Sequence, residues 1–346
     1  MRALTVRPGV PGSGALTDLP EPAPEEGQVL VATRAVGICG TDAEVLGGEH
    51  GAAPDGEELL VLGHESLGEV LEAPQGSSLA PGDAVVGVVR RPDPVPCASC
   101  AAGEFDMCRN GRFTEHGISG RHGFARERWR ADPDALVRVD AGLGGLGVLL
   151  EPTSVVAKAW EHIERIGGRA VWEPQQVLVT GAGPIGLLAA LLAVQRGLEV
   201  HVLDRVADGP KPALVERLGA TYHCGPAADL GLTPDVVVEC TGAPAVIGEV
   251  LGGTARNAVV CLTGVSSAKG ATPVDLGRLN REWVLQNDVV FGSVNANRRH
   301  YALAAAALAA ADRGWLAGLI TRRVPVESFA EALEPRDGDV KTVLTF

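Results

Sequence analysis

Short apolar runs separated by turn residues dominate the first 150 residues of the chain. Apolar stretches lie at 29–35, 67–71 and 84–89, and a Pro-Gly-Asp turn at 81–83 separates two of them. Runs of this length bounded by Gly, Pro and Asp are typical of β-strands. The pattern predicts an irregular, mostly β domain in this part of the chain.

From about residue 151 onward the pattern changes to apolar strands that alternate with helical segments. Strands separated by helices of this length form a parallel sheet that helices cover on both faces. The sequence therefore predicts a doubly wound α/β unit, followed by a further helix and a final strand. The predicted strands span 176–180, 199–203, 234–240, 258–263, 288–293 and 341–346, and the predicted helices span 185–196, 211–218, 245–254 and 301–312.

Length and charge narrow the classes of protein that the chain can belong to. With 346 residues it is long enough for two domains, and 46% hydrophobic against 21% charged residues is typical of a globular protein. Lys and Arg number 30 against 43 Asp and Glu, which gives a net charge of −13. Nucleic acids and anionic membranes require clustered positive charge, so the sequence argues against both as partners.

The sequence also predicts a cytoplasmic location. The first thirty residues hold Pro, Gly and acidic residues where a secretory signal has its apolar core. The longest apolar run, 185–194, is too short to cross a bilayer. In a reducing compartment, the seven cysteines are expected to be thiols or metal ligands rather than disulfides.

A glycine-rich turn joins the predicted strand 176–180 to the helix that follows it. Gly181, Gly183 and Gly186 stand in the order G-x-G-x-x-G. The first glycine permits a tight turn, the second lets the backbone approach a pyrophosphate, and the third lets the helix pack on the strand. The N-terminus of the helix then faces the phosphates. The sequence predicts a dinucleotide site with contacts from Gly181, Gly183, Pro184, Ile185, Gly186, Asp204, Arg205 and Thr241.

Asp204 bears on the choice of dinucleotide. It ends the second strand, 18 residues after Gly186, where an acid that binds the adenosine ribose is expected. A carboxylate there accepts bonds from the 2′-hydroxyl and repels a 2′-phosphate, which favours NAD over NADP. Arg205 and the nearby Lys211 leave NADP open, although Arg205 is equally explained as a solvated loop cation.

Three residues of the first domain offer ligands for a catalytic metal. Cys39, His64 and Glu65 provide a thiolate, an imidazole and a carboxylate, a set that suits zinc with one open position. Each residue also has a structural explanation, because a cysteine after an apolar strand is usually buried and a single histidine is more often structural. From the residues alone, the zinc site and the structural explanation both stay open.

These motifs together resemble the medium-chain zinc-dependent alcohol dehydrogenases over essentially the whole chain. They are 37–42 (Gly-Ile-Cys-Gly-Thr-Asp), 63–65 (Gly-His-Glu), a segment with three cysteines, and the glycine turn. The resemblance implies a GroES-like, mostly β catalytic domain formed by 1–154 and 294–346, around a Rossmann domain at 155–293. Segments similar to the glucose 1-dehydrogenase branch are 113–118, 150–153, 280–282 and 292–295.

The resemblance assigns roles to the candidate metal ligands. It makes Cys39 and His64 direct zinc ligands, and Glu65 a third ligand or a partner through water. Glu151 stands where many relatives have a cysteine, and in the glucose branch this position holds zinc or its water. Asp42 would accept the second ring N–H of a ligating histidine, or it would simply cap the helix that follows Gly40.

The resemblance also implies a reaction and a set of substrate contacts. Zinc lowers the pKa of a bound hydroxyl. The Thr41 hydroxyl accepts the proton and passes it toward the cofactor ribose or water, and hydride passes to C4 of the nicotinamide. Glu115, Glu151 and Asn295 would contact a sugar, and Asn295 would also lie near the nicotinamide. Glu115 is otherwise a surface carboxylate, and Asn295 a turn residue at a strand end. His50 would end a proton relay or is an exposed loop histidine.

The cysteine-containing segment resembles the structural zinc lobe of the same superfamily, with one departure. The family pattern is C-x₂-C-x₂-C-x₇-C, and Cys97, Cys100 and Cys108 match its last three positions. Pro94 stands at the first, so Asp93 or another residue would supply the fourth ligand, or the lobe holds no metal. Cys224, Cys240 and Cys261 are expected to be core or loop thiols.

The leading functional hypothesis is therefore a zinc-dependent oxidoreductase that transfers a hydride from C1 of a glucose-like aldose to NAD(P). An alternative substrate is another polyol, an amino-polyol or a secondary alcohol of a specialised pathway. A different class is a zinc-free nucleotide-binding sensor or reductase, and a third is an interaction module built on the cysteine lobe. The resemblance also implies a homodimer or homotetramer that pairs through the nucleotide domain.

Overall fold

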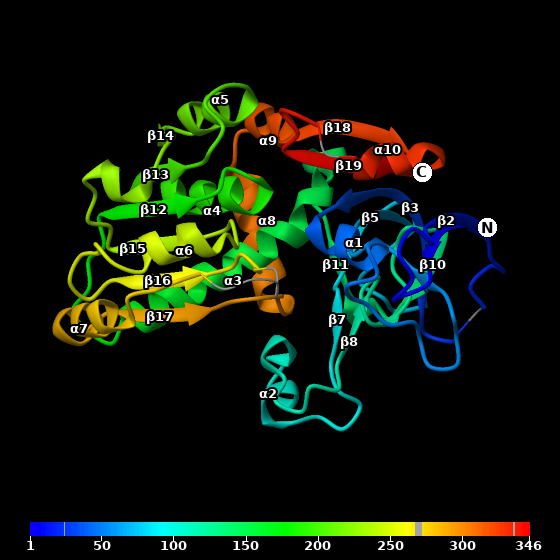
Figure 1. The fold of residues 1–346 in the computed structure, drawn as a ribbon. Helices are drawn as coiled ribbons and strands as arrows, with labels where there is room; N and C mark the ends of the chain where they lie inside the picture. The colour runs from blue at the N-terminus through cyan, green and yellow to red at the C-terminus, as the bar shows by residue number, and fades with distance from the viewer. Residues whose placement is uncertain (24, 267–271, 335) are drawn as a thin grey trace. The chain divides into compact units, whose positions relative to one another are not determined.

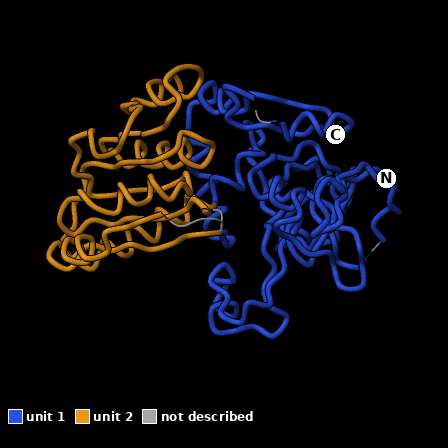
Figure 2. The backbone as a smooth tube through the Cα atoms, viewed as in Figure 1, with its two compact units in different colours: residues 1–154, 295–346 blue, residues 155–294 orange. Residues whose placement is uncertain are grey.

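The computed structural model describes residues 1–23, 25–266, 272–334 and 336–346. The chain forms two compact units, which Figure 2 distinguishes by colour. Unit 1 consists of Met1–Ser154 together with Asn295–Phe346, and unit 2 consists of Val155–Val294. The two ends of the chain thus fold together, and unit 2 is inserted between them in the sequence.

Unit 1 is mostly β, as the alternation of short apolar runs predicts. Its largest sheet has the order β11-β6-β5-β3-β19-β18, with β10 also paired to β3. These strands are β3 (Val29–Ile38), β5 (Glu65–Glu72), β6 (Ala84–Gly87), β10 (Arg128–Ala131), β11 (Leu136–Arg138), β18 (Ile320–Pro325) and β19 (Lys341–Thr345). Two three-stranded sheets join β2 (Ala15–Asp18), β1 (Arg2–Val6) and β4 (Leu60–Val61), and β7 (Arg90–Arg91), β8 (Thr114–His116) and β9 (Gly120–Arg121).

The register around β3 decides which residues meet in unit 1. The C-terminal strand β19 runs antiparallel to β3, with Thr342 opposite Ile38, and β5 runs antiparallel on the other side, with Glu65 opposite Gly37. The ends of three strands that are distant in sequence therefore lie together. A side chain at Gly37 would come within 2.9 Å of the Lys341 side chain and would also collide with Glu65.

The polar side chains of Asn297 and Asp312 cap two helices of unit 1. Asn297 caps α8 (Arg298–Ala310) by accepting the Arg299 N–H at 3.0 Å. The predicted helix at 301–312 therefore starts three residues earlier than expected, because the cap precedes the apolar pattern. The other helices that lie wholly in unit 1 are α1 (Gly40–Leu46), α2 (Ala98–Ala101), α9 (Arg313–Leu319) and α10 (Phe329–Leu333), with 3₁₀ turns η1 (Phe105–Met107), η2 (Pro133–Ala135), η3 (Ala141–Leu149) and η5 (Val326–Ser328).

Unit 2 holds a six-stranded parallel sheet in the order β14-β13-β12-β15-β16-β17 (Figure 1). This is the doubly wound order expected of a Rossmann domain, so that prediction is confirmed. The strands are β12 (Gln176–Thr180), β13 (Glu199–Leu203), β14 (Thr221–His223), β15 (Val236–Glu239), β16 (Val259–Leu262) and β17 (Val289–Gly292). The helical elements are α4 (Pro184–Gln195), α5 (Pro210–Arg217), η4 (Ala227–Leu230), α6 (Pro244–Val250) and α7 (Leu276–Gln286). Helix α3 (Leu150–Gly167) begins in unit 1, and its residues from Val155 onward belong to unit 2.

The central elements of unit 2 are deeply buried. All four residues of β15 are buried, as expected of a central strand in a parallel sheet. Helix α4 is apolar nearly all round and buried over most of its length, which explains why its sequence reads as one long apolar run.

Within the described residues no single helix is long and apolar enough to cross a membrane, and one bent pair, α8 with α9, reaches the required length only jointly.

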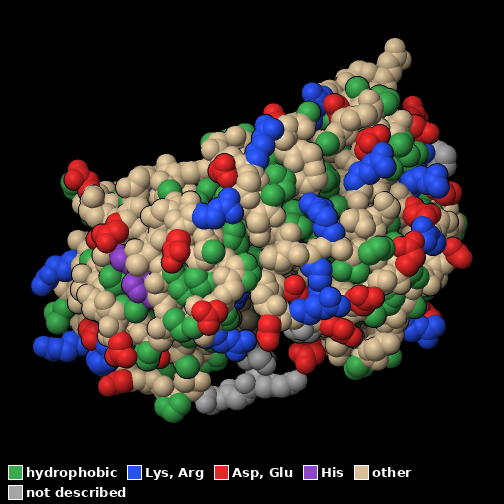
Figure 3. All heavy atoms as spheres, turned by 90° about the horizontal axis from the view of Figure 1, so that it is seen from above, with side chains coloured by type: hydrophobic (Ala, Val, Ile, Leu, Met, Phe, Trp, Pro, Cys, Tyr) green, Lys and Arg blue, Asp and Glu red, His purple; other side chains and the backbone are tan. Residues whose placement is uncertain are grey.

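Figure 3 shows charged side chains of both signs mixed on one face. On the face shown in Figure 3, basic and acidic side chains alternate, and the coloured residues form no continuous basic patch there. This distribution agrees with the acidic net charge of the chain.

Candidate active site and dinucleotide site

The segment after β3 presents a thiol at the start of a helix. Cys39 is the N-cap of α1, and its Sγ accepts the Thr41 N–H at 3.3 Å. In return, Asp42 Oδ2 accepts the Cys39 N–H at 2.9 Å, which completes a capping box. The capping box fixes the direction of the Cys39 side chain and the position of Thr41 in the first turn of α1.

His64 lies against this cysteine. Its Nε2 is 3.2 Å from Cys39 Sγ, and its Nδ1 is 3.5 Å from Asp42 Oδ1. One carboxylate oxygen of Asp42 therefore caps α1, and the other faces the imidazole. A carboxylate behind the imidazole fixes the ring orientation and favours coordination through the other nitrogen.

The charges at this site favour a cation. Burial alone would lower the pKa of His64, but the neighbouring Cys39 and Asp42 outweigh it and hold that pKa well above its usual value. Burial raises the pKa of Glu151 to about 7, and the Glu65 carboxylate adds to this rise. Several acidic groups therefore crowd one buried space, and a bound divalent cation would offset their repulsion.

The ligand atoms are close enough to share one ion. Cys39 Sγ, a ring nitrogen of His64 and a carboxylate oxygen of Glu65 all lie within 4.8 Å of one another. A thiolate, an imidazole and a carboxylate in one buried group fit zinc better than calcium or magnesium, which prefer oxygen ligands alone. The residues present therefore fit the metal that the sequence predicts.

Sequence reasoning missed a buried lysine at this site. Lys341 at the start of β19 is 1% exposed and forms an ion pair with Glu65, and its Nζ donates to the Ile38 carbonyl at 2.9 Å. Burial would lower the pKa of Lys341, but Glu65 and then Cys39 hold it above its usual value. A lysine within an apolar C-terminal strand was the available signal, because such a residue is rarely buried without a partner.

A second polar group of unit 1 surrounds Glu115. Glu115 Oε1 accepts from Arg90 Nε at 3.1 Å, from Arg90 Nη2 at 3.0 Å and from Asn295 Nδ2 at 2.7 Å. Asn295 is one of three non-glycine residues of the described chain with a positive φ, at 63°. The structure thus brings two predicted sugar contacts together, and it adds Arg90, which the sequence analysis did not single out.

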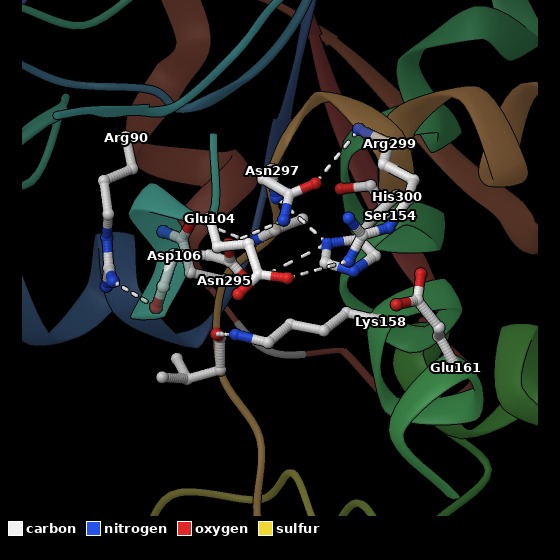
Figure 4. A network of polar contacts seen from close by, with 12 residues as sticks. Arg90, Glu104, Asp106, Ser154, Lys158, Glu161, Asn295, Asn297, Arg299 and His300 are labelled. Carbon is white, nitrogen blue, oxygen red and sulfur yellow. Dashed lines mark hydrogen bonds and ion pairs between the residues drawn. The ribbon is translucent and has the colours of Figure 1, made fainter. Parts of the chain in front are cut away.

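The same group continues toward α8, as Figure 4 shows. Arg90 Nη1 donates to the Asp106 carbonyl at 2.9 Å, and Asn297 Nδ2 donates to Asp106 Oδ1 at 2.7 Å. The Asn297 N–H donates to His300 Nδ1 at 3.0 Å. These contacts join β7 and η1 to the start of α8, although the two segments are about 190 residues apart in sequence.

The cysteine lobe gathers its three sulfur atoms. Cys97, Cys100 and Cys108 offer ligand atoms within 4.8 Å of one another. The Arg109 N–H, and after it the Cys100 N–H, lower the pKa of Cys97 to about 6, whereas burial raises that of Cys100 to about 11. Asp93, the candidate fourth ligand, accepts instead from the Val95 N–H, Asn110 Nδ2 and Arg112 Nε at 2.8, 2.8 and 3.1 Å.

The glycine-rich turn of unit 2 follows β12 directly. Gly181 has a φ of +89°, and its N–H donates to the Leu203 carbonyl at 2.7 Å. Gly183 is the N-cap of α4, and Pro184 and Ile185 form its first turn. A Cβ at Gly186 would collide with the Gly181 carbonyl oxygen, whereas one at Gly183 would meet nothing within 4 Å. The third glycine thus serves packing, and the second leaves space above the helix.

Asp204 is more heavily engaged than the sequence suggested. Its Oδ2 accepts the Ala182 N–H at 2.6 Å and pairs with Lys211 Nζ at 3.0 Å, and its Oδ1 accepts the Val206 N–H at 3.2 Å. Burial would raise the pKa of Asp204, but Lys211 and the Ala182 N–H hold it below its usual value. Arg205 is exposed.

Thr241 lies against the same turn. A Cβ at Gly181 would stand 3.0 Å from Thr241 Cγ2. The buried Glu239, at the end of β15, accepts the Thr241 N–H at 2.7 Å and the Thr180 hydroxyl at 3.2 Å. Glu239 therefore ties the ends of two central strands together below the turn, and sequence reasoning had no signal for it other than an acid at a strand end.

The remaining predicted residues are placed plainly. His50 is exposed in the loop after α1. Cys261 is buried and Cys240 partly buried in unit 2, and Cys224 is exposed in a loop, in line with the expectation of core or loop thiols. Every cysteine of the chain is a free thiol in this structure.

Comparison with known proteins places these features in one family. The family model for the alcohol dehydrogenase GroES-like domain matches residues 25–141, and the model for the glucose dehydrogenase C-terminus matches residues 144–346. The chain is 42% identical to glucose 1-dehydrogenase 2 of Vulcanisaeta moutnovskia and 41% identical to glucose 1-dehydrogenase of Thermoproteus tenax, in each case over 99% of both chains.

A solved structure agrees with the sequence relatives. Glucose dehydrogenase of Haloferax mediterranei, in complex with NADP, zinc and gluconolactone, superposes with a TM-score of 0.92 at 35% identity, covering 100% of this chain and 99% of the other. The expected combination of a GroES-like domain and a Rossmann domain is thereby confirmed. The chain belongs to the glucose 1-dehydrogenase family of medium-chain, zinc-dependent alcohol dehydrogenases.

Proposed function

We propose that the protein oxidises C1 of a glucose-like aldose to the lactone and transfers the hydride to NAD or NADP, with zinc at the active site. The observation that carries the proposal is the buried group of Cys39, His64 and Glu65, in a chain that also holds a complete dinucleotide turn. The named relatives act on glucose, and the Haloferax structure holds a sugar lactone, NADP and zinc.

Residues of unit 1 have distinct parts in this reaction. Zinc supplies Lewis acidity that makes a substrate hydroxyl easier to deprotonate. Cys39, His64 and Glu65 hold the ion, and Glu151 completes its surroundings or holds a water. Asp42 keeps the His64 ring in orientation, at 3.5 Å. The Thr41 hydroxyl would accept the substrate proton while passing its own to the cofactor ribose or to water, and the capping box keeps this residue beside Cys39.

The first test is nicotinamide reduction at 340 nm with D-glucose, with and without a zinc chelator. We expect turnover that the chelator removes and added zinc restores, because the acidic group cannot activate a hydroxyl without a cation. A zinc-loaded protein that leaves aldoses untouched and oxidises another polyol or an amino-polyol would replace the proposed substrate. Equal activity in the chelated protein would support a zinc-free reductase instead.

For the cofactor, we propose that both NAD and NADP bind in unit 2, at the turn from Gly181 to Gly186 and at Asp204. The ion pair with Lys211 at 3.0 Å cancels the charge that would repel a 2′-phosphate. NADP in the Haloferax structure supports this reading. Asn295 is proposed to contact the nicotinamide as well as the sugar.

Lys211→Met should therefore weaken NADP binding by roughly tenfold and change NAD binding by less than threefold, because Asp204 loses the cation that offsets its repulsion of a 2′-phosphate. Titration of protein fluorescence with each dinucleotide measures both constants. Arg205→Met is the matched comparison, as a neighbouring exposed cation. A larger NADP loss in Arg205→Met than in Lys211→Met would move the phosphate contact to Arg205.

We propose that the cysteine lobe holds a structural zinc through Cys97, Cys100 and Cys108. Three converging thiols with backbone N–H groups directed at Cys97 support this. Asp93 would have to leave Asn110 and Arg112 to become the fourth ligand, so a water molecule is the simpler fourth ligand. Free thiols throughout the chain also fit the proposed cytoplasmic location.

We propose that the protein is a homo-oligomer that pairs through unit 2. Strand β17 lies at the edge of the parallel sheet, and its first three residues are only partly buried. Beside it in sequence, α7 exposes Leu276, Val284 and Leu285. Exposed apolar side chains on a helix that precedes an unpaired edge strand offer a self-complementary surface for a twofold dimer.

Placing glutamate at both Val284 and Leu285 should then shift the protein from dimer or tetramer to smaller species in light scattering. The comparison is Val171→Glu, at an apolar residue of the same unit that is 98% exposed. It should leave the assembly unchanged, because an isolated exposed side chain has nothing to separate. A monomeric wild-type protein would end the proposal.

A further inference from the structure

We propose that Arg90 is a specificity-determining residue, which neutralises and aims Glu115 so that the sugar site accepts an uncharged hydroxyl-bearing substrate and disfavours a cationic amino-sugar. The inference rests on the proposed function, in which Glu115 contacts the sugar. It separates the leading hypothesis from the amino-polyol alternative by a feature of the site itself.

The guanidinium of Arg90 is held on every side. Strands β7 and β8 pair with Arg90 opposite Glu115, so the two side chains start from adjacent backbone positions. Nε and Nη2 both donate to Glu115 Oε1, and Nη1 donates to the Asp106 carbonyl. The Phe113 ring lies 3.7 Å from the guanidinium carbon, and the Arg90 side chain is 8% exposed. The cation therefore has one position.

The two oxygens of Glu115 are used unequally. Oε1 accepts two bonds from Arg90 and a third from Asn295. None of the residues that the structure describes donates to Oε2, and the side chain remains 13% exposed. A carboxylate fixed through one oxygen leaves the other as an acceptor of known direction, which is what recognition of a sugar hydroxyl requires.

Glu115 is anchored next to the proposed zinc ligands within unit 1. Two residues further along the chain, a Cβ on Gly117 would stand 2.5 Å from the carbonyl oxygen of Gly63, the residue before His64. On the other side of Arg90 along the chain, the Val89 N–H donates to the Tyr301 hydroxyl at 3.4 Å. Burial and then the Glu151 carboxylate hold the pKa of that hydroxyl well above its usual value. These contacts connect the strands that carry Arg90 and Glu115 to the residue before a proposed zinc ligand and to Tyr301.

Charge balance then decides which substrates fit. A lone buried carboxylate would attract an ammonium group more strongly than a hydroxyl. With the guanidinium at 3.0 Å the pair carries no net charge, so a hydroxyl can donate to Oε2 while an ammonium also meets the Arg90 cation. A neighbouring like charge of this kind is a repulsive element against the wrong substrate.

The test compares kcat/KM for D-glucose and D-glucosamine, at a pH where the amine is protonated. Wild-type protein should prefer glucose. In Arg90→Met, we expect the glucose value to fall at least tenfold, mainly through KM, and the glucosamine-to-glucose ratio to rise at least tenfold. In Glu115→Gln the unpaired guanidinium remains, so the same ratio should fall below that of wild type. A merely structural role cannot move the ratio in opposite directions.

Zinc content and dinucleotide affinity, measured on each variant, report whether the fold survives. Arg90→Lys keeps the charge without the planar fork and should hold the ratio near the wild-type value while lowering both activities. This variant and Glu115→Gln keep the inference testable if Arg90→Met does not fold. A ratio that is unchanged, or that moves the same way in both Arg90→Met and Glu115→Gln, overturns the inference and leaves the proposed function standing. A zinc-loaded, dinucleotide-binding wild-type protein with no aldose turnover refutes both.

Discussion

Gly186→Ala should destabilise the protein by roughly 3 kcal/mol or more, because a methyl group there overlaps backbone that cannot move aside. The Cβ would collide with the Gly181 carbonyl oxygen and would lie within 3.4 Å of the Val179 side chain. Strand β12 and helix α4 would have to separate to admit it. Chemical denaturation followed by fluorescence measures the loss.

Gly183→Ala is the matched control for this change. It should cost little stability but much dinucleotide affinity. Its Cβ meets nothing within 4 Å and its φ of −79° suits alanine, so stability should fall by only about 1 kcal/mol, the cost of a poorer N-cap. Dinucleotide affinity should fall by at least about tenfold, since the methyl group occupies the space where a pyrophosphate approaches. A Gly183→Ala protein that binds NADPH as wild type does would place the phosphates elsewhere.

Lys341→Met is expected to cost about 3–5 kcal/mol of stability, since it leaves a buried carboxylate without its partner. Lys341 is 1% exposed and Glu65 is 3% exposed, so water cannot replace the lost ion pair. The Ile38 carbonyl loses its bond at 2.9 Å as well. We also expect altered zinc affinity, because Lys341 holds the position of a proposed ligand. Denaturation curves and competition with a chromogenic zinc chelator measure the two effects.

The double variant Lys341→Met/Glu65→Gln is the control for the charge argument. Removing both charges should recover much of the stability lost in Lys341→Met, because a neutral amide can be buried at lower cost than a lone carboxylate. If the double variant is no more stable than Lys341→Met, the loss comes from packing against Gly37 rather than from the unpaired charge.

Much of the fold was predictable because its signals are local. The strands of unit 2 other than β14 agree with prediction to within two residues at each end, since each is a short apolar run between turn residues. The three-residue strand β14 was not predicted. Helix α4 begins one residue before its predicted start, at a proline after the glycine turn. The helix predicted at 245–254 ends early, at Val250, where Leu251 caps it before Gly252 and Gly253. Helices α3 and α7 were not predicted, although both are amphipathic. The helices α1, α2, α9 and α10 were not predicted because seven residues or fewer are too short to show a helical period.

In the candidate site, too, the residues that lie in local motifs were predictable and those that depend on tertiary contacts were not. Cys39, His64 and Glu65 were recognisable because the family motifs that hold them are short stretches of sequence. Arg90 and Lys341 were not, because each acquires its role from a partner brought to it by strand pairing. The engagement of Asp204 by Lys211 was equally invisible, since it depends on how the loop before α5 folds back.

By itself, the sequence determined the parallel sheet, the dinucleotide turn and the ligand types of the metal group, because these follow from local periodicity, glycine spacing and side-chain chemistry. Only the tertiary structure decided how the buried charges are compensated. Lys341 reaches the Ile38 carbonyl across 303 residues, and Asn295 reaches Glu115 across 180. Such pairs depend on the register of β19 against β3 and on the return of the chain to unit 1 at Asn295. No local sequence pattern encodes this register or this return of the chain. Each buried charge is stabilised only when its distant partner is also present.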